Sequence, residues 1–122
     1  MPTAEQFQSV FTQLKQILQP FAPQLVVQAD TPENYYLDTP HIAHLQRSIF
    51  FGAVQIKKNY VSYHLMSVYI FPALLDQISP QLKKRMQGKS CFNFTRIDQA
   101  MLDELAHLTA QGFEVYRREY GI

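Results

Sequence analysis

The chain has 122 residues, of which 47% are hydrophobic, with 11 Lys and Arg residues against 10 Asp and Glu residues and a single cysteine. This length fits one domain spanning residues 1–122, and the hydrophobic fraction excludes intrinsic disorder. One cysteine excludes a disulfide framework. No uncharged apolar run approaches the roughly 18 residues of a membrane-spanning helix, and the first residues lack the pattern of a signal peptide. We therefore expect a cytoplasmic protein without a membrane partner.

The charges are unevenly distributed along the chain. Residues 1–46 carry one basic and four acidic side chains, residues 47–96 carry eight and one, and residues 97–122 carry two and five. A basic middle segment thus lies between two acidic ends, although the net charge is only +1. We expect the acidic terminal helices to pack beside the basic segment and to neutralise it.

The first predicted element is an amphipathic helix that starts near residue 4. Its apolar residues recur at helical spacing from Phe7 to Leu18. Thr3 and Gln6 have the spacing of a capping box, and Pro20 and Pro23 predict the end of the helix.

Short β-forming runs follow the prolines. Residues 25–27 and 35–37 predict two strands, joined through turn-forming residues at 30–34. Residues 39–48 give no clear period and predict a loop, with room for one irregular strand. The strongest hairpin has arms at 49–56 and 60–70, with a turn at 57–59. In its second arm, alternation assigns Tyr63 to one face and His64 to the other.

The last third of the chain mixes helices with one strand. Short helices are predicted at 72–77 and at 80–87, the second ending at Gly88, and a strand at 90–94. From Asp98 one helical phase continues to Tyr120 through Gly112, which favours a single long helix; a break at Gly112 is the alternative. The element order predicts an α+β fold, an antiparallel sheet of about five strands with helices packed on one face.

Known catalytic and metal-binding patterns are missing from the sequence. No G-x-S-x-G motif occurs, and Gly88-Lys89-Ser90 lacks the earlier glycine of a phosphate-binding loop. The four histidines are too scattered to predict a ligand set, so no metal, no cofactor and no catalytic residue is predicted. Two interpretations of Cys91 stay open: a small buried hydrophobe, or a thiolate favoured by Lys84, Arg85 or Lys89.

The basic segment also contains aromatic residues, a combination that is typical of single-stranded nucleic-acid platforms. Against the motif of RNA-recognition domains, however, residues 49–56 match only at Phe51, Gly52 and Val54. We therefore do not expect a nucleic-acid partner. A charged helix face and a hairpin turn explain the same residues.

Residues 47–110 resemble the YdhG-like family of domains of unknown function. The features that carry the resemblance are the strand with Tyr63-His64, the Pro72-Ala73-Leu74-Leu75 segment, the Gly88–Phe94 run and the closing helix at 101–108. The resemblance implies a small α+β domain with a helix-backed antiparallel sheet. It also implies an alternative function, since some members are likened to frataxin and proposed as iron chaperones. Iron prefers carboxylate ligands, and the first helix offers only Glu5.

Two functional hypotheses follow. The first is a non-enzymatic binding or accessory domain that recognises a small anionic molecule or a protein partner on its sheet face. Its candidate ligand-binding residues are Tyr63, His64, Lys83, Lys84, Arg85, Lys89 and Cys91. The second is an enzyme whose site the sequence does not reveal, with His64 as its general base. An exposed aromatic sheet face could also be buried in a homodimer.

Overall fold

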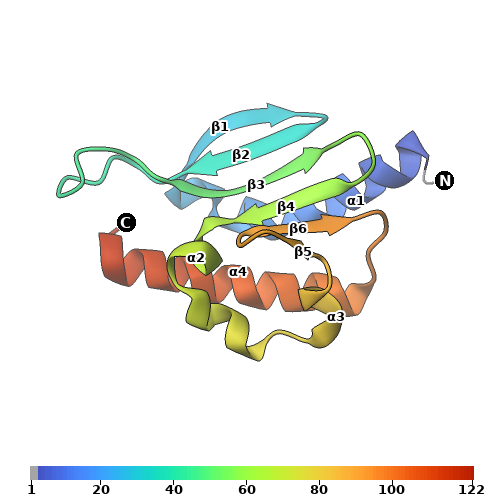
Figure 1. Ribbon diagram of the computed structural model, residues 1–122. Helices are drawn as coiled ribbons and strands as arrows, with labels where there is room; N and C mark the ends of the chain where they lie inside the picture. Colours follow the sequence, from blue (N-terminus) through green and yellow to red (C-terminus); the bar gives the residue numbers. More distant parts are fainter. Residues whose placement is uncertain (1–2) are drawn as a thin grey trace.

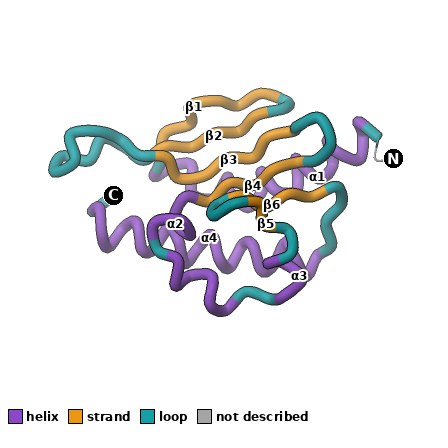
Figure 2. Tube along the Cα trace, viewed as in Figure 1, coloured by secondary structure: helices purple, strands orange, loops and turns teal. Residues whose placement is uncertain are grey.

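A computed structural model describes residues 3–122, and in this part of the chain six antiparallel strands form one sheet with the order β1-β2-β3-β4-β6-β5 (Figures 1 and 2). The elements in chain order are α1 (Ala4–Leu18), the 3-10 helix η1 (Gln19–Gln24), β1 (Val26–Thr31), β2 (Asn34–Asp38), β3 (Phe50–Ile56), β4 (Val61–Leu65), α2 (Met66–Ile70), the 3-10 helix η2 (Pro72–Gln77), α3 (Pro80–Lys83), β5 (Met86–Gln87), β6 (Cys91–Phe94) and α4 (Gln99–Tyr120). The long helices α1 and α4 pack against each other on one face of the sheet, and within residues 3–122 no helix covers the other face (Figure 1). The predicted α+β class, with an antiparallel sheet and helices on one face, is confirmed.

Helix α1 forms as its sequence predicts. The Thr3 hydroxyl accepts a hydrogen bond from the Gln6 backbone, and the Gln6 side chain accepts one from the Thr3 backbone, which completes the capping box. Its apolar stripe is buried against the sheet, where Gly52 in β3 allows the close approach. A Cβ atom at Gly52 would lie 3.3 Å from the Leu18 side chain and 3.1 Å from the carbonyl oxygen of His64.

A β-bulge in β3 adds an aromatic side chain to the core. Leu37 pairs with Gly52 and Asp38 with Phe50, so Phe51 is the extra residue, and it is fully buried under the helices. Its ring packs edge to face on Phe113 and Tyr116 of α4, with centroid distances of 5.8 Å and 5.3 Å. The bulge thus connects the sheet to α4.

Helix α4 is continuous through Gly112, which confirms the single long helix and excludes the break. Asp98 caps its N-terminus by accepting a hydrogen bond from the Met101 backbone at 2.9 Å. Gly112 is the point of closest contact with α2, because a Cβ atom there would overlap Ser67 Oγ and lie 2.9 Å from Ser67 Cβ. Close packing against Ser67 therefore requires a residue without a Cβ atom at position 112.

Two predicted boundaries are wrong, because each segment interacts with another element of the fold. The strand predicted at 60–70 ends at Leu65, and residues 66–70 form α2, whose Ser67 packs closely against Gly112 of α4. The helix predicted at 80–87 covers only Pro80–Lys83, because Met86 and Gln87 pair with β6 as strand β5. This short strand makes the sheet six-stranded instead of about five-stranded.

The remaining predictions hold with small shifts. The first hairpin is β1 with β2, with β1 extended to Thr31, and the segment at 72–77 is a 3-10 helix. The loop at 39–48 contains one isolated bridge between Ile42 and Arg47, in agreement with its irregular prediction. The strand predicted at 90–94 is β6, Cys91–Phe94.

Candidate functional site

The uncovered sheet face brings His64 and Cys91 side by side. They are register partners on β4 and β6, and the Leu65 amide donates to the Ser90 carbonyl at 2.9 Å, which makes them a non-hydrogen-bonded pair. In such a pair the side chains lie closest, with Cβ atoms about 4.5–5.5 Å apart. Ser62 and Asn93 form the next pair along the same face.

Tyr63 does not belong to this face, so its predicted place in the site is wrong. It pairs with Phe92 on the helix-covered side, is fully buried, and its hydroxyl shares a 2.5 Å hydrogen bond with Thr109 Oγ1. Burial raises the pKa of the Tyr63 phenol far above its ordinary value. Tyr63 therefore stabilises the core and cannot contact a ligand on the open face.

Cys91 and His64 are both half-buried and both neutral near pH 7. Burial raises the pKa of the Cys91 thiol, an effect that the nearby Lys57 ammonium opposes, and the thiol donates to Asn93 Oδ1 at 3.2 Å. Burial lowers the pKa of His64, and the Lys57 charge lowers it further. A raised thiol pKa argues against the reactive thiolate and favours the other interpretation, in which Cys91 is a small packing residue.

Six of the eight basic residues of the middle segment lie at one end of the sheet. Lys57 and Lys58 occupy the β3–β4 turn, and Arg96 follows β6, whose Phe94 pairs with Val61 next to that turn. The Arg85 carbonyl accepts from the Asn93 amide at 2.8 Å, which places the segment from Lys83 to Arg85 at the same end. We call Lys57, Lys58, Lys84, Arg85 and Arg96 the basic end; all five side chains are exposed.

Lys89 lies elsewhere. It occupies the turn between β5 and β6, at the opposite end of these strands from Arg85. The structure thus brings Lys83, Lys84 and Arg85 together and separates Lys89 from them, so the four residues do not form one rim as predicted.

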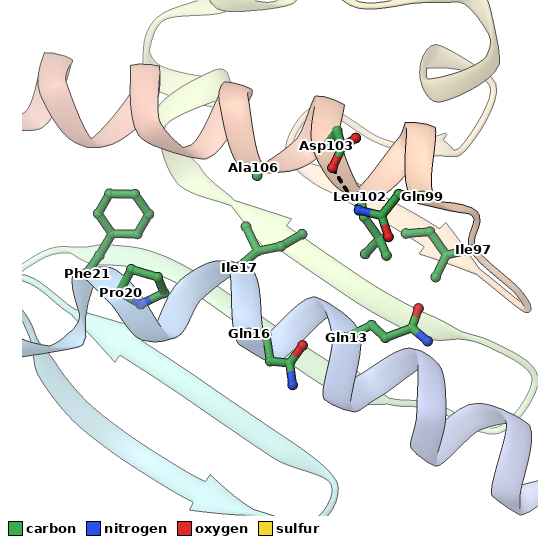
Figure 3. A pocket seen from close by; sticks show the side chains of 10 residues that line it. All are labelled: Gln13, Gln16, Ile17, Pro20, Phe21, Ile97, Gln99, Leu102, Asp103 and Ala106. Carbon is green, nitrogen blue, oxygen red and sulfur yellow. Dashed lines mark hydrogen bonds between the residues drawn. The ribbon is translucent and has the colours of Figure 1, made fainter.

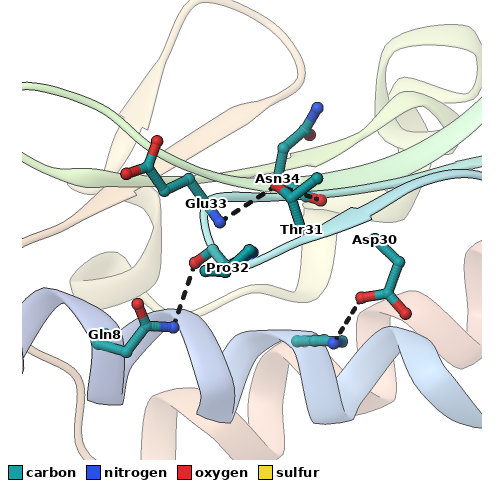
Figure 4. A network of polar contacts seen from close by, with 7 residues as sticks. Gln8, Asp30, Thr31, Pro32, Glu33 and Asn34 are labelled. Carbon is teal, nitrogen blue, oxygen red and sulfur yellow. Dashed lines mark hydrogen bonds and ion pairs between the residues drawn. The ribbon is translucent and has the colours of Figure 1, made fainter.

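The expected neutralisation by the acidic terminal segments is wrong. Within residues 3–122 two salt bridges form, Lys15 with Asp30 at 2.8 Å and Arg117 with Glu114 at 3.5 Å. The first belongs to the network that ties α1 to the β1–β2 hairpin, where Gln8 also donates to the Pro32 carbonyl (Figure 4). No basic residue of 47–96 takes part in either pair.

Acidic side chains near the basic end make other contacts or lie in a turn. Glu104 accepts hydrogen bonds from both the backbone amide and the hydroxyl of Ser79, at 2.5 Å and 2.7 Å, and so holds the start of α3. Asp98 caps α4, and Glu33 lies in the β1–β2 turn at the same end of the sheet. The basic end therefore keeps a positive excess.

A cavity of about 430 Å³ opens at the basic end. It is lined by Asn59, Tyr60, Lys84, Arg85, Gln87, Asn93, Phe94 and Thr95. We call it the basic-end cavity; two cations, four uncharged polar residues and two aromatic residues line it, and none of the eight is acidic. Arg85 also lines a second cavity of about 570 Å³, which Arg96 shares on the side of α1.

A larger groove of about 630 Å³ lies between α1 and α4, and Figure 3 shows its side chains. Its only charged residue is Asp103, which already accepts a hydrogen bond from Gln99 at 2.8 Å. Glutamine and aliphatic side chains make up most of the rest. This groove offers a ligand little specific chemistry.

In residues 3–122 no three His, Cys, Asp or Glu side chains are grouped so that they could hold a metal ion. Among the helices of this part of the chain, none combines the length and the apolar character needed to cross a membrane.

Sequence reasoning missed part of the cavity. The sequence predicts a hairpin turn at Asn59, a strand at Asn93, and at Tyr60 one of the aromatic residues interleaved with the basic segment. One local signal was present for Asn93, because its spacing of two from Cys91 puts both on the same face. Asn93 meets Arg85 through the β5–β6 hairpin, whereas the meeting of Asn59 and Tyr60 with Lys84 and Arg85 depends on the strand order, which no local signal reveals.

Comparison with known proteins gives no further guide to the site: no family model matches the chain, and no match was found among curated proteins or solved structures.

Proposed function

We propose that the chain is a non-enzymatic cytoplasmic binding domain that takes a small anionic ligand at its basic end and the adjoining part of the uncovered sheet face. One observation carries this proposal: the basic residues of 47–96 make no ion pair within residues 3–122, and five of them surround or adjoin a cavity without acidic lining. Clustered charge of one sign raises the local concentration of oppositely charged ligands.

The lining of the basic-end cavity supports binding of a defined small molecule. Arg85 supplies a planar fork of N–H donors, and Lys84 supplies a compact positive charge, which together suit carboxylate or phosphate oxygens. Amide side chains beside them can donate and accept hydrogen bonds. A cavity of this volume falls in the range of about 300–1,000 Å³ that small-molecule sites occupy.

The neighbouring His64 and Cys91 support binding more than catalysis. The imidazole makes no side-chain hydrogen bond within the described residues, whereas a general base normally has a partner that orients it. Its closest described aromatic partner is Phe50, at a centroid distance of 6.3 Å. Family membership, homodimer formation and a protein partner stay predictions.

A binding screen tests the proposal. Thermal shift would be measured with inorganic phosphate, citrate, a sugar phosphate and nucleoside monophosphates, on the wild type and on the K84Q/R85Q double variant. At least one anion should raise the melting temperature of the wild type and not that of K84Q/R85Q, while the unliganded variant melts like the wild type, because both side chains are exposed. The matched control is K89Q, which removes an exposed lysine at the other end of the strands and should respond like the wild type.

Two results would end the proposal. One is the absence of any anion-dependent shift in the wild type. The other is an equal shift in the wild type and in K84Q/R85Q, since the ligand would then lie elsewhere.

A further inference from the structure

We propose that the basic-end cavity takes a phosphate monoester joined to a planar ring, a molecule of the size and kind of a nucleoside monophosphate. This inference rests on the proposed function and names the ligand class of the same site. It follows from the number of cations, the position of one aromatic ring and the free amide groups.

The charges in the cavity match one phosphate monoester. Two cations, Lys84 and Arg85, line it, and one phosphate monoester carries a charge of about −1.5 to −2 near pH 7. Neither cation has an acidic partner within residues 3–122, so no ion pair must break when the ligand binds. A monocarboxylate would leave one of the two charges unmatched.

The cavity also contains a planar aromatic surface. Tyr60 is half-buried and directly precedes β4, and the Lys57 amide donates to its carbonyl at 2.8 Å, which fixes the turn that carries the ring. Aromatic side chains stack on bases with little dependence on which base is present, at about 1–3 kcal/mol per base. Tyr60 is the aromatic side chain that a ligand in the cavity can reach, because Phe94, the other aromatic residue of the lining, is fully buried.

Amide groups complete the lining. The Oδ1 atom of Asn93 is occupied by the Cys91 thiol, so its two N–H donors are the groups left for a ligand oxygen. Asn59 and Gln87 offer both donors and acceptors, which suits the hydroxyl groups and ring edges of a nucleoside. Inorganic phosphate alone would leave Tyr60 and these amides unused.

The experiment is a calorimetric titration of the wild-type chain with adenosine and uridine monophosphates, adenosine, inorganic phosphate, citrate and a ten-nucleotide oligouridine. Both monophosphates should bind at least tenfold more tightly than adenosine or phosphate. R85Q should weaken their binding about tenfold, as expected for loss of a charged hydrogen bond. Y60L, which removes the ring, should weaken monophosphate binding at least fivefold. Y60F, which keeps the ring, and K89Q should both bind like the wild type.

The possible outcomes separate this inference from the proposed function. Citrate binding that depends on Arg85, without monophosphate binding, overturns the ligand class and leaves the anion-binding function intact. Monophosphate binding no tighter than that of phosphate, or equal in Y60L and Y60F, also overturns it. Tighter binding of the oligouridine that depends on Lys57 and Lys58 would overturn it in favour of a nucleic-acid partner. If no anion binds, both proposals fail.

Discussion

Gly112 in the middle of α4 gives the sharpest test of how the helices pack. Gly112→Ala adds a methyl group whose carbon would overlap Ser67 Oγ and lie 2.9 Å from Ser67 Cβ. Inserting a methyl group into a packed core typically costs about 1–3 kcal/mol. Alanine returns about 1 kcal/mol through its higher helix propensity. Because the contact involves both side-chain atoms of Ser67, we expect the packing cost to win and the free energy of unfolding to fall by about 1–2 kcal/mol.

Urea denaturation followed by far-UV circular dichroism measures this change, and two further variants make it specific. Ala110→Gly, at an exposed position of the same helix, calibrates helix propensity alone and should cost about 1 kcal/mol. Ser67→Ala removes the overlapping oxygen, which is buried without a hydrogen-bond partner, so it should be close to neutral and should recover part of the loss in the double variant. A Gly112→Ala chain at least as stable as the wild type, or a loss that Ser67→Ala leaves unchanged, would refute this packing.

Three more predictions follow from buried polar groups. Tyr63→Phe should lower the free energy of unfolding by about 1–2 kcal/mol, because Thr109 Oγ1 then has no partner in the core. Adding Thr109→Val should recover most of this loss in urea denaturation. No recovery in the double variant would mean that the hydrogen bond is unimportant. Ser62→Ala should be neutral or slightly stabilising in the same assay, since the Ser62 hydroxyl is buried without a hydrogen bond of normal geometry, and a clear loss would mean that it has one. The lowered pKa of His64 means that the unfolded chain binds its proton first as the pH falls through about 6.5, so stability should fall below that pH, and less so in His64→Gln. An NMR titration that gave His64 a pKa of 6.5 or above would contradict this.

The sequence predicts those parts of the fold that local signals determine. The N-terminal starts of α1 and α4 follow from Thr3 and Asp98, whose side chains cap the two helices. The continuity of α4 through Gly112 follows from the uninterrupted apolar phase. By contrast, α2 packs against a residue distant in the chain, with Ser67 against Gly112, and its segment has the local pattern of a strand. The segment of β5 has the local pattern of a helix, and its pairing with the neighbouring β6, Met86 with Phe92, makes it a strand.

The same distinction explains the candidate site. Strand alternation alone assigns Tyr63 and His64 to opposite faces, so the sequence itself argues against a ligand on one sheet face that contacts both. The meeting of Tyr60 with Arg85 could not be predicted, because it depends on β4, β6 and β5 lying next to one another in that order. The distribution of charges along the sequence predicts the basic segment. It does not predict that the segment lacks acidic partners, because that depends on where each side chain lies in the fold.

The central claim is that the basic end holds free cations around a cavity that accepts an anion. Backbone amide NMR of the ¹⁵N-labelled chain, titrated with adenosine monophosphate, tests it most directly. The largest chemical-shift changes should fall on residues 57–60, 84–87 and 93–95, which come from three separate segments and meet only in this fold. Changes confined to the turn around Lys89 or to the groove between α1 and α4, or no saturable change at all, would contradict the claim.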